Sequence, residues 1–378
     1  MNPWPELDPA LMAPVTEREE LRQVVRGLLE KYADHETVRA AADTPAGYSA
    51  ELWRRLNAEL EIGRLAVPEE RGGHGYGLAD LGVVLEECGA ALLPEPVLAS
   101  AVLGCQALAA ADDPTAVADL LADALSGELV VVTSTGGDEL TAEQAPDGGW
   151  TVSGARSRVL QGAAADVVVL DVTTAEGRLL LAVRAADLEI TDRTTVDPTR
   201  RQADLRLASA PARVVVGPER CADVVARLGL IADAAVAAEH SGIVGELLDQ
   251  VVAYVAQREQ FGRAIGSFQA IKHRLADVLV DRERARSASR YALAALDEGG
   301  PDAALAVPLA AAVAADAVVR TAHEAVQLHG GIGFTWEHRA HYYLRRALGD
   351  EGLLGASRSQ RARIADLVGL PAAGAVSG

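Results

Sequence analysis

The feature that most constrains the fold is a set of three long helical stretches in the C-terminal half of the chain. They cover residues 221–261, 268–298 and 303–329, and apolar residues recur in each at helical spacing. Helices of this length bury their apolar faces by packing side by side. The pattern therefore predicts an antiparallel bundle, in which oligomerisation covers any apolar face left over.

Two earlier regions differ in their periodicity. Residues 16 to about 125 are helical in pattern, and Thr16 followed by Glu19 predicts a capping box at the first helix. From about Gly127 to Gly217 the chain shows period-two or short β-branched runs separated by turn residues. We therefore expect an N-terminal helical domain (1–126), a middle β domain (127–217) and a C-terminal helical bundle (218–378).

Composition excludes several function classes. The chain has 378 residues, 49% of them hydrophobic, which suits a globular protein with substantial cores. The net charge of −19 argues against a nucleic-acid-binding surface, because neutralising phosphates requires clustered Lys and Arg. The start "MNPWPELDPA" shows no signal-peptide pattern, and no membrane span is evident. We expect a cytoplasmic protein with no nucleic-acid or membrane partner.

Cysteines and histidines give no metal motif. The three cysteines are far apart and odd in number, which predicts reduced thiols: Cys88, Cys105 and Cys221. Four histidines crowd one region without a carboxylate to complete a zinc set: His323, His329, His338 and His341. We expect no metal site.

The stretch "VQLHGGIGF", Val326 to Phe334, places three glycines at the end of a helical run. Either a helix stop or a close backbone approach to a cofactor explains such bare backbone. No strand precedes it, so it is not a dinucleotide-binding fingerprint.

Several separated motifs resemble those of the acyl-CoA dehydrogenase family. They are "YVAQREQFGRAIGSFQAIKHRLADVLVDRERAR", "AVQLHGGIGFTWEHRAHYYLRRA" and the earlier "LAVPEERGGHGYGLADLGVVLEECG". They occur in the family's order, and the resemblance covers essentially the whole chain. It implies an α+β fold with an N-terminal helical domain, a middle β domain and a C-terminal antiparallel four-helix bundle.

The resemblance also implies a noncovalent FAD between the β domain and the bundle, reaching into a neighbouring subunit of a tetramer. The residues implied to bind it are Arg258, Phe261, Gln269, Gln327, Gly330, Gly331 and Thr133. Arg258 would pair with the diphosphate, Phe261 would pack near the adenosine, and Gln327 at its helix end would supply an amide. The alternatives are that Arg258 is a surface arginine, that Phe261 is a core ring and that the glycines form a helix C-cap.

The β domain departs from the family pattern. "TSTGGDEL" replaces the usual "TEPGAGS"-like loop under the flavin, although Thr133 keeps a hydroxyl. The strand whose Trp usually covers the ring corresponds to "GARSRVLQG", which has Arg158 and Val159 there. We interpret these changes as subfamily character typical of members acting on bulky acyl-CoAs.

Dehydrogenation of an acyl thioester needs a base for the α-proton while the flavin takes the β-hydrogen as hydride. The resemblance places the family's base at position 354 or, in a minority, at position 232. These positions hold Leu354 and Ala232, so neither base is present. Glu239 lies seven residues after Ala232 on nearly the same helical face, and we take it as the tentative catalytic base.

Other acids are weaker candidates. Glu246 lies further along the same face, and Asp233 points about 100° away. Asp350 and Glu351 would need a register change to replace position 354. The structural alternative is that Glu239 is an acid held by a neighbouring Arg or His.

The expected function is α,β-dehydrogenation of an acyl-CoA with a bulky or non-standard acyl group in lipid metabolism. An electron-transfer flavoprotein or a similar acceptor would take the electrons. One alternative is a base-lacking partner subunit of a hetero-oligomer, and another is a flavin oxidase or hydroxylase on the same fold. A homo-oligomer and a hetero-oligomer with a homologous chain both remain open.

Overall fold

The computed structural model describes residues 15–137, 140–146, 148–336, 338–354 and 357–370. These form two compact units. The bundle unit comprises Met1–Leu29, Gly82–Leu92 and Asp233–Gly378, and the barrel unit comprises Glu30–Leu81 and Leu93–Ala232. The expected order of an N-terminal helical region, a middle β region and a C-terminal helical region is confirmed.

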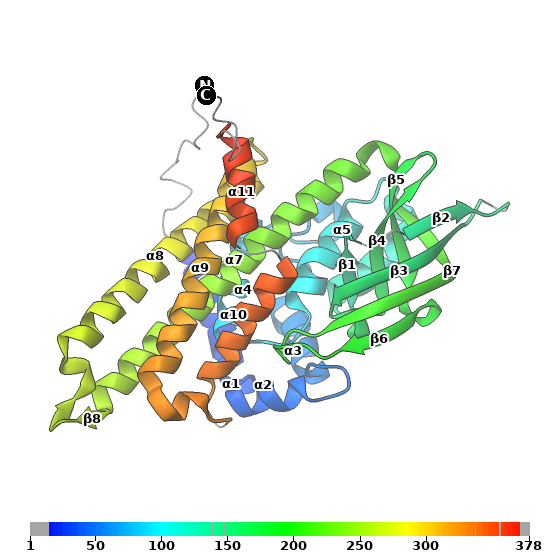
Figure 1. Cartoon of the computed structure of the whole chain (residues 1–378). Helices are drawn as coiled ribbons and strands as arrows, with labels where there is room; N and C mark the ends of the chain where they lie inside the picture. The colour runs from blue at the N-terminus through cyan, green and yellow to red at the C-terminus, as the bar shows by residue number, and fades with distance from the viewer. Residues whose placement is uncertain (1–14, 138–139, 147, 337, 355–356, 371–378) are drawn as a thin grey trace, which may run out of the picture. The chain divides into compact units, whose positions relative to one another are not determined.

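The bundle unit is built from long helices (Figure 1). They are α1 Thr16–Tyr32, α4 Leu78–Ala90, α7 Pro218–Gln257, α8 Gln269–Glu298, α9 Ala303–His329, α10 Ala340–Leu354 and α11 Ser357–Leu367. A hairpin of β8 Glu259–Gln260 and β9 Arg263–Ala264 follows α7, then η7 Ile265–Ser267, while η8 Gly330–Phe334 follows α9. The three predicted long helices are confirmed, since α7, α8 and α9 have 40, 30 and 27 residues.

Helices α4 and α7 touch through their backbones at two glycines. A Cβ at Gly242 would lie 1.8 Å from the Glu86 carbonyl oxygen, and one at Gly89 would lie 2.2 Å from that of Glu239. No side chain fits at such distances, so this crossing requires glycine at both positions.

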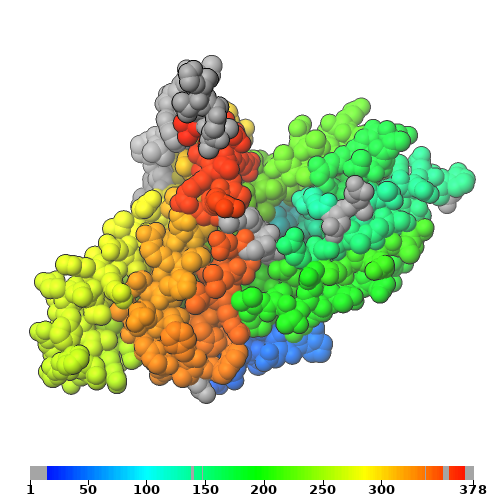
Figure 2. Space-filling model, viewed as in Figure 1, coloured from blue at the N-terminus to red at the C-terminus, as the bar shows by residue number. Residues whose placement is uncertain are grey.

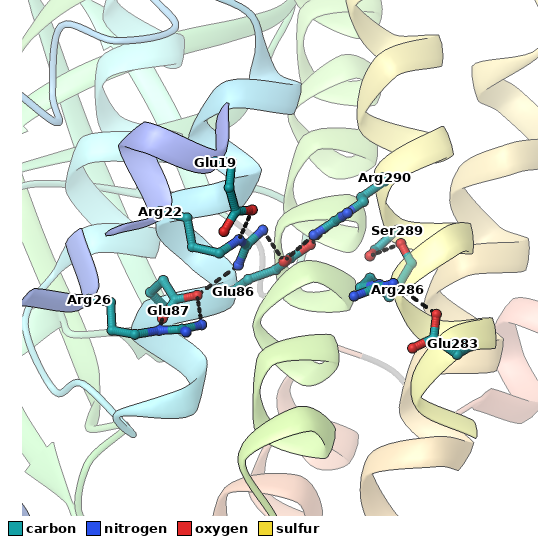
Figure 3. A network of polar contacts seen from close by, with 9 residues as sticks. All are labelled: Glu19, Arg22, Arg26, Glu86, Glu87, Glu283, Arg286, Ser289 and Arg290. Atoms are coloured by element: carbon teal, nitrogen blue, oxygen red, sulfur yellow. Dashed lines mark hydrogen bonds and ion pairs between the residues drawn. The ribbon is translucent and has the colours of Figure 1, made fainter. Parts of the chain in front are cut away.

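A buried charge network on α4 ties three helices together (Figure 3). The Glu86 carboxylate accepts hydrogen bonds from Arg290 Nε and Nη2 at 3.0 Å each and from Arg22 Nη2 at 2.6 Å. The neighbouring Glu87 accepts from Arg22 and Arg26. The pairing compensates carboxylates that would otherwise be costly to bury.

The barrel unit combines short helices with a seven-stranded sheet. Its helical elements are α2 His35–Ala42, α3 Ala50–Leu60, η2 Glu69–Arg71, η3 Val97–Gly104, α5 Cys105–Ala109, η4 Pro114–Val117, α6 Ala118–Ser126, η5 Gly162–Ala164 and η6 Ala185–Asp187. The strands are β1 Val131–Ser134, β2 Leu140–Gln144, β3 Trp150–Leu160, β4 Val167–Thr174, β5 Gly177–Arg184, β6 Glu189–Arg193 and β7 Gln202–Val216. The strand order is β1-β4-β2-β3-β7-β5 and β4 also pairs with β5, so the sheet closes on itself as a barrel, with β6 added to β7.

The core of the barrel unit joins the sheet to the helices before it. Buried apolar side chains of α5 and α6 pack against those of β1, β4 and β5. The π-helical η3 is buried along its whole length, and its Ser100 Oγ accepts a hydrogen bond from the Val131 amide at 3.0 Å. This contact fixes the start of β1, the strand that carries Thr133.

Some sequence-based expectations at element ends are wrong. The capping box is displaced, because α1 begins at Thr16 itself and the Val15 carbonyl accepts from the Arg18 and Glu19 amides. Helix α9 ends at His329, as the periodicity predicts, and not at Gln327, where the family resemblance had placed its end. Strand β2 and the first part of β7 were not predicted. Strand β2 is mostly exposed, whereas the start of β7 does alternate, with Ala203, Leu205 and Leu207 buried, and was overlooked.

One helix among the described residues, Ala303–Phe334, is long and apolar enough to cross a membrane by length and composition. More than half of its apolar window is buried inside the structure, and the core helix of a soluble protein passes the same test. The N-terminal stretch used to judge a signal peptide lies outside the described residues.

Candidate active site

The hairpin after α7 presents two of the residues implied to bind the cofactor. Arg258 is exposed, its amide bonds to the Tyr254 carbonyl, and its own carbonyl accepts from the Ile265 amide. Phe261 and Gly262 occupy the turn with positive φ of 54° and 75°. Phe261 is 91% exposed, so the alternative of a core ring is wrong. A left-handed, exposed aromatic residue is a strained arrangement of the kind found at functional sites.

The two adjacent glycines after α9, Gly330 and Gly331, have different structural roles. The Gly330 amide bonds to the Val326 and Gln327 carbonyls and its φ is 63°, so Gly330 is the C-cap of α9. Gly331 has no positive φ, and a Cβ built on it would meet nothing within 4 Å. Neither conformation nor packing among the described residues requires glycine at 331.

The ends of α7 and α9 lie together. The Tyr254 hydroxyl donates to the His329 carbonyl at 3.4 Å, and the two rings are 4.6 Å apart. The hairpin and the glycine loop thus share one end of the bundle unit, and the hairpin forms an outer corner in yellow-green in Figure 2. Several residues there are exposed: Gln269, Gln327, Phe334 and Trp336.

Thr133 ends in a buried hydroxyl without a hydrogen-bond partner among the described residues. The next turn is fixed by Asp171 on β4, whose Oδ1 accepts from the Gly136 amide at 2.9 Å. Asp171 is itself buried and held by Arg156 Nη2 at 3.1 Å. An unsatisfied buried hydroxyl costs about 1–3 kcal/mol, so a hydrogen-bond acceptor or donor placed beside Thr133 would stabilise this arrangement.

The end of β3 has irregular backbone where the family's aromatic residue is expected. Arg158 and Gln161 have positive φ of 56° and 50°, and the pairing with β7 shifts register between Arg156 and Val159. Arg158 is exposed while Val159 is buried. The bulge therefore turns the arginine outward, away from the barrel core.

The predicted base Glu239 is buried at 4% exposure on α7. Its neighbours Ala235 and Ile243 are fully buried, which confirms the apolar face. Glu239 has an interaction partner of its own. Glu246 is paired with Arg339 and accepts from Gln250 at 2.8 Å, so it is occupied. The side chain of Leu354 lies outside the described residues.

A cavity of about 350 Å³ opens inside the bundle unit between α7, α9, α10 and α11. Much of its wall consists of small side chains, among them Ala237, Ala311, Ala315 and Ala347. Its volume lies at the lower end of the range for small-molecule sites. Glu239 is not among its lining residues, whereas Asp233, His240 and Asp350 are.

The most deeply buried ionisable groups at this cavity are His240 and Asp350. His240 Nε2 lies 3.1 Å from Asp350 Oδ2, and the side chains are 6% and 1% exposed. Sequence reasoning missed this pair, because the two residues lie 110 positions apart and only Asp350 had been considered. Burial raises the pKa of Asp233 at the cavity rim, against the lowering effect of its contacts with Gln360 and Arg363.

Glu95 is a second group that sequence reasoning missed. Burial raises the pKa of this carboxyl from 4.5 to about 7, although the Ser49 amide donates to Oε1 at 3.0 Å. Oε2 is buried with no partner among the described residues. The adjacent Pro94 carbonyl accepts from Gln161 Nε2 at 2.5 Å, at the end of β3. The sequence signal that could have identified Glu95 is an acidic residue between two prolines within an apolar run.

Thiols and metal ligands play no visible part. Cys88, Cys105 and Cys221 are free and buried, and burial raises the pKa of Cys105 to about 12. Within the described ranges, no group of three or more His, Cys, Asp or Glu residues could hold a metal ion. His338 lies in the turn before α10 and not on a helix, with its ring 4.3 Å from that of His329.

The residues present fit a flavin nucleotide on three counts. The Thr133 hydroxyl needs a partner, Arg258 is an exposed cation on a fixed hairpin, and Gly331 leaves open backbone beside an exposed amide side chain. A hydroxyl, a guanidinium and bare backbone suit a flavin edge, a diphosphate and a close nucleotide contact, respectively.

Comparisons with known proteins agree along nearly the whole chain. The family model "Acyl-CoA dehydrogenase, N-terminal domain" matches residues 16–128, and "Acyl-CoA dehydrogenase, C-terminal domain" matches residues 232–369. The acyl-CoA dehydrogenase IpdE2 of Mycolicibacterium smegmatis is 37% identical over 92% of this chain and 97% of its own length.

Solved structures share the fold. The ChsE4-ChsE5 complex from Mycobacterium tuberculosis contains a chain with a TM-score of 0.86 and 29% identity, covering 96% of this chain and 99% of that one. A structure of a variant of the Tcur3481-Tcur3483 steroid ACAD has a TM-score of 0.84 and 28% sequence identity. The match covers 94% of this chain and 98% of that one. A further match is a chain in a structure of the electron transferring flavoprotein of Acidaminococcus fermentans, with a TM-score of 0.88 and 20% identity. It covers 95% of this chain and 99% of that one, and at this identity it shows the fold alone.

The matching relatives imply a flavin cofactor and an oxidoreductase, which agrees with the donors described above. The chain belongs to the acyl-CoA dehydrogenase family.

Proposed function

We propose that this chain binds FAD and catalyses the α,β-dehydrogenation of a bulky acyl-CoA thioester. The single observation that carries the proposal is the buried Thr133 hydroxyl, which lacks a partner among the described residues and belongs to the strand that the family places against the flavin. A flavin supplies the redox chemistry when bound, by accepting a hydride from the substrate Cβ.

Each proposed cofactor contact is assigned to a particular part of the flavin nucleotide. Thr133 would hydrogen-bond the flavin edge, and Arg258 would hold the diphosphate as a charged fork. Phe261 would pack near the adenosine, Gln269 and Gln327 would supply amides, and Gly330 and Gly331 would let backbone lie against the nucleotide. The exposure of the bundle-unit residues supports an FAD shared with a neighbouring subunit.

A bulky acyl group is supported by the relatives. One related structure is described as a steroid ACAD. We therefore propose a steroid-derived acyl-CoA as the substrate class, within lipid metabolism in the cytoplasm, with an electron-transfer flavoprotein or similar acceptor.

The second candidate is a subunit that works only with a homologous partner. Position 232 holds Ala and position 354 holds Leu, so both usual positions lack a carboxylate. Two related structures are of complexes of two named chains, ChsE4-ChsE5 and Tcur3481-Tcur3483. These observations support a hetero-oligomer in which each chain contributes part of the FAD site, and a tetramer is the assembly we propose.

The test is turnover by the tagged chain purified from its native host, so that any partner remains attached. Steroid-derived and straight-chain acyl-CoAs are supplied with an artificial electron acceptor, and the products are analysed by mass spectrometry. We expect an enoyl-CoA lighter by two hydrogen atoms from the steroid-derived thioester. Thr133→Val should lower the flavin content while Thr141→Val, an exposed hydroxyl on β2, should not. Equal flavin content in both variants would remove the main support for the proposed site.

A further inference from the structure

The cavity in the bundle unit is built from one face of each helix that surrounds it. On α7 it is lined by positions 233, 236, 237 and 240, which share one side of the helix, as do positions 347, 350 and 351 on α10. All of its lining residues belong to the bundle unit, and none of them is proposed to bind the flavin. Whatever occupies the cavity is therefore recognised by this unit alone.

Small apolar side chains on three helices leave the space open. They are Val236, Ala237, Ala311, Ala315, Val319 and Ala347. Ala237 and Ala347 are fully buried, whereas Ala311 and Ala315 on α9 are half-buried, as expected of side chains that face a cavity. A volume of about 350 Å³ behind such a wall suits a compact molecule with a hydrocarbon body.

His240 leaves one ring nitrogen available to a ligand. Its side chain is 6% exposed, and Nε2 lies 3.1 Å from Asp350 Oδ2. An ionised carboxylate can only accept hydrogen bonds, so Nε2 carries the proton of the neutral ring. Nδ1 is then an acceptor, and within the described ranges it has no hydrogen-bond partner of its own. An acceptor on a buried side chain that lines a cavity calls for a donor inside the cavity.

Carboxylates dominate the charged part of the lining. Among the described residues, one arginine lines the cavity, Arg320, against four acidic residues: Asp233, Asp316, Asp350 and Glu351. Arg320 lies 3.0 Å from Asp281, and its side chain is 54% exposed, so water screens its charge. The polar lining therefore offers more acceptors than donors and carries an excess of negative charge, which attracts a cation.

Arginines outside the lining offset part of this charge. Arg361 pairs with Asp316, and Arg363 lies 3.5 Å from Asp233. Burial nonetheless raises the pKa of Asp233. The side chains of Asp350 and Asp233 are 1% and 14% exposed, compared with 35% for Asp316. Water screens the two buried carboxylates least, so theirs is the charge that a molecule in the cavity meets.

We propose that this cavity binds a small organic cation, a primary ammonium compound with a compact apolar body. An ammonium group has three N–H donors, which match the acceptors at His240 Nδ1 and at the carboxylates of Asp233 and Asp350. Its hydrocarbon body would lie against the alanine wall. An anion of the same size would meet like charges, which makes its binding unfavourable. The site is independent of the proposed function, because it needs neither the flavin nor an acyl-CoA.

The test compares three molecules that share a 3-methylbutyl group and differ in its polar end: 3-methylbutylamine, 3-methylbutanol and 4-methylpentanoate. Each is titrated into the purified protein at pH 7, and its dissociation constant is measured by ligand-observed NMR. We expect the amine to bind about tenfold more tightly than the alcohol, because charge-assisted hydrogen bonds are stronger than neutral ones. The carboxylate should not bind.

Two variants locate the binding in the cavity. Ala315→Leu fills the space from α9 and should weaken amine binding about tenfold or more, whereas Ala58→Leu, the same change on an exposed position of α3, should leave it unchanged. Asp350→Asn keeps the shape of the side chain and removes its charge. It should weaken the amine about tenfold but leave the affinity for the alcohol within about twofold, whereas a merely structural loss would weaken both.

Three results would overturn the proposal. Equal affinities for the amine and the alcohol would show that the carboxylates do not select a cation. Amine binding that is the same in Ala315→Leu and Ala58→Leu would place the amine elsewhere on the protein. Binding of none of the three molecules would leave the cavity to water alone. The proposed function is tested separately by flavin content and turnover, so either can fail while the other stands.

Discussion

Two pairs of glycines in the bundle unit differ in what requires them. At Gly89 and Gly242 a Cβ would lie 2.2 Å and 1.8 Å from a carbonyl oxygen of the facing helix. At Gly331 a Cβ would meet nothing within 4 Å, and only its neighbour Gly330 is fixed by a positive φ. The first pair is explained by packing within the chain, whereas neither packing nor conformation among the described residues requires glycine at 331, where we propose that the cofactor approaches.

The same contrast extends to the side chains around each pair. Near the α4–α7 crossing the Glu86 carboxylate is buried and bound by two arginines. Near the glycine loop, Phe261, Phe334 and Trp336 are exposed. The charged groups at the helix crossing are thus satisfied within the chain, whereas the exposed aromatic side chains near the glycine loop are the ones that we propose to contact the cofactor.

The largest expected effect is that of Gly242→Ala. The added methyl group overlaps the Glu86 carbonyl, so the free energy of unfolding should fall by about 3 kcal/mol or more, measured by chemical denaturation. Gly229→Ala on the same helix is the control, because a Cβ there meets nothing and alanine favours helix by about 1 kcal/mol. Equal stability of the two variants would contradict the backbone contact.

Glu86→Gln should lower the free energy of unfolding slightly less than Gly242→Ala does, by about 3 kcal/mol. It leaves Arg22 and Arg290 without their shared carboxylate, although the Arg290 side chain is 41% exposed and keeps some hydration. Glu51→Gln, which removes a partner of Arg55 on the surface of α3, should change stability by less than about 0.5 kcal/mol. A Glu86→Gln variant as stable as Glu51→Gln would show that the network is not structural.

Glu95 makes the free energy of unfolding depend on pH, by up to about 3 kcal/mol. Its folded pKa of about 7 exceeds the ordinary value of 4.5, so its favourable contribution is complete below pH 4.5 and is lost as pH rises through 7. Relative to the wild type, Glu95→Gln should therefore gain stability between about pH 5 and pH 8, by up to about 3 kcal/mol. A stability difference that stays constant over this range would place the pKa near its ordinary value.

The smallest effect on stability is expected at Gly331. Gly331→Ala should change the free energy of unfolding of the flavin-free chain by less than about 0.5 kcal/mol, yet weaken flavin binding about tenfold or more. Gly330→Ala should instead destabilise the chain by about 1–2 kcal/mol, because its φ is positive. Unchanged flavin affinity in Gly331→Ala would mean that no cofactor approaches this backbone.

Helical periodicity predicted the long helices well, and α9 has the bounds Ala303–His329 that the pattern gives. Strand β2 was missed because its residues are mostly exposed and lack apolar alternation. The His240–Asp350 pair could not be predicted, since contact over 110 residues depends on how α7 and α10 pack. Thr133 was identified through the family resemblance, but only the structure reveals that its hydroxyl has no partner among the described residues.

The proposed flavin site and reaction are tested by the visible spectrum of the purified protein under anaerobic conditions, before and after a steroid-derived acyl-CoA is added. We expect a bound flavin whose oxidised absorption band disappears on addition of the thioester and remains when free coenzyme A is added. A protein that purifies with its partner yet holds no flavin, or a flavin that no acyl-CoA reduces, would contradict flavin-dependent dehydrogenation by this chain.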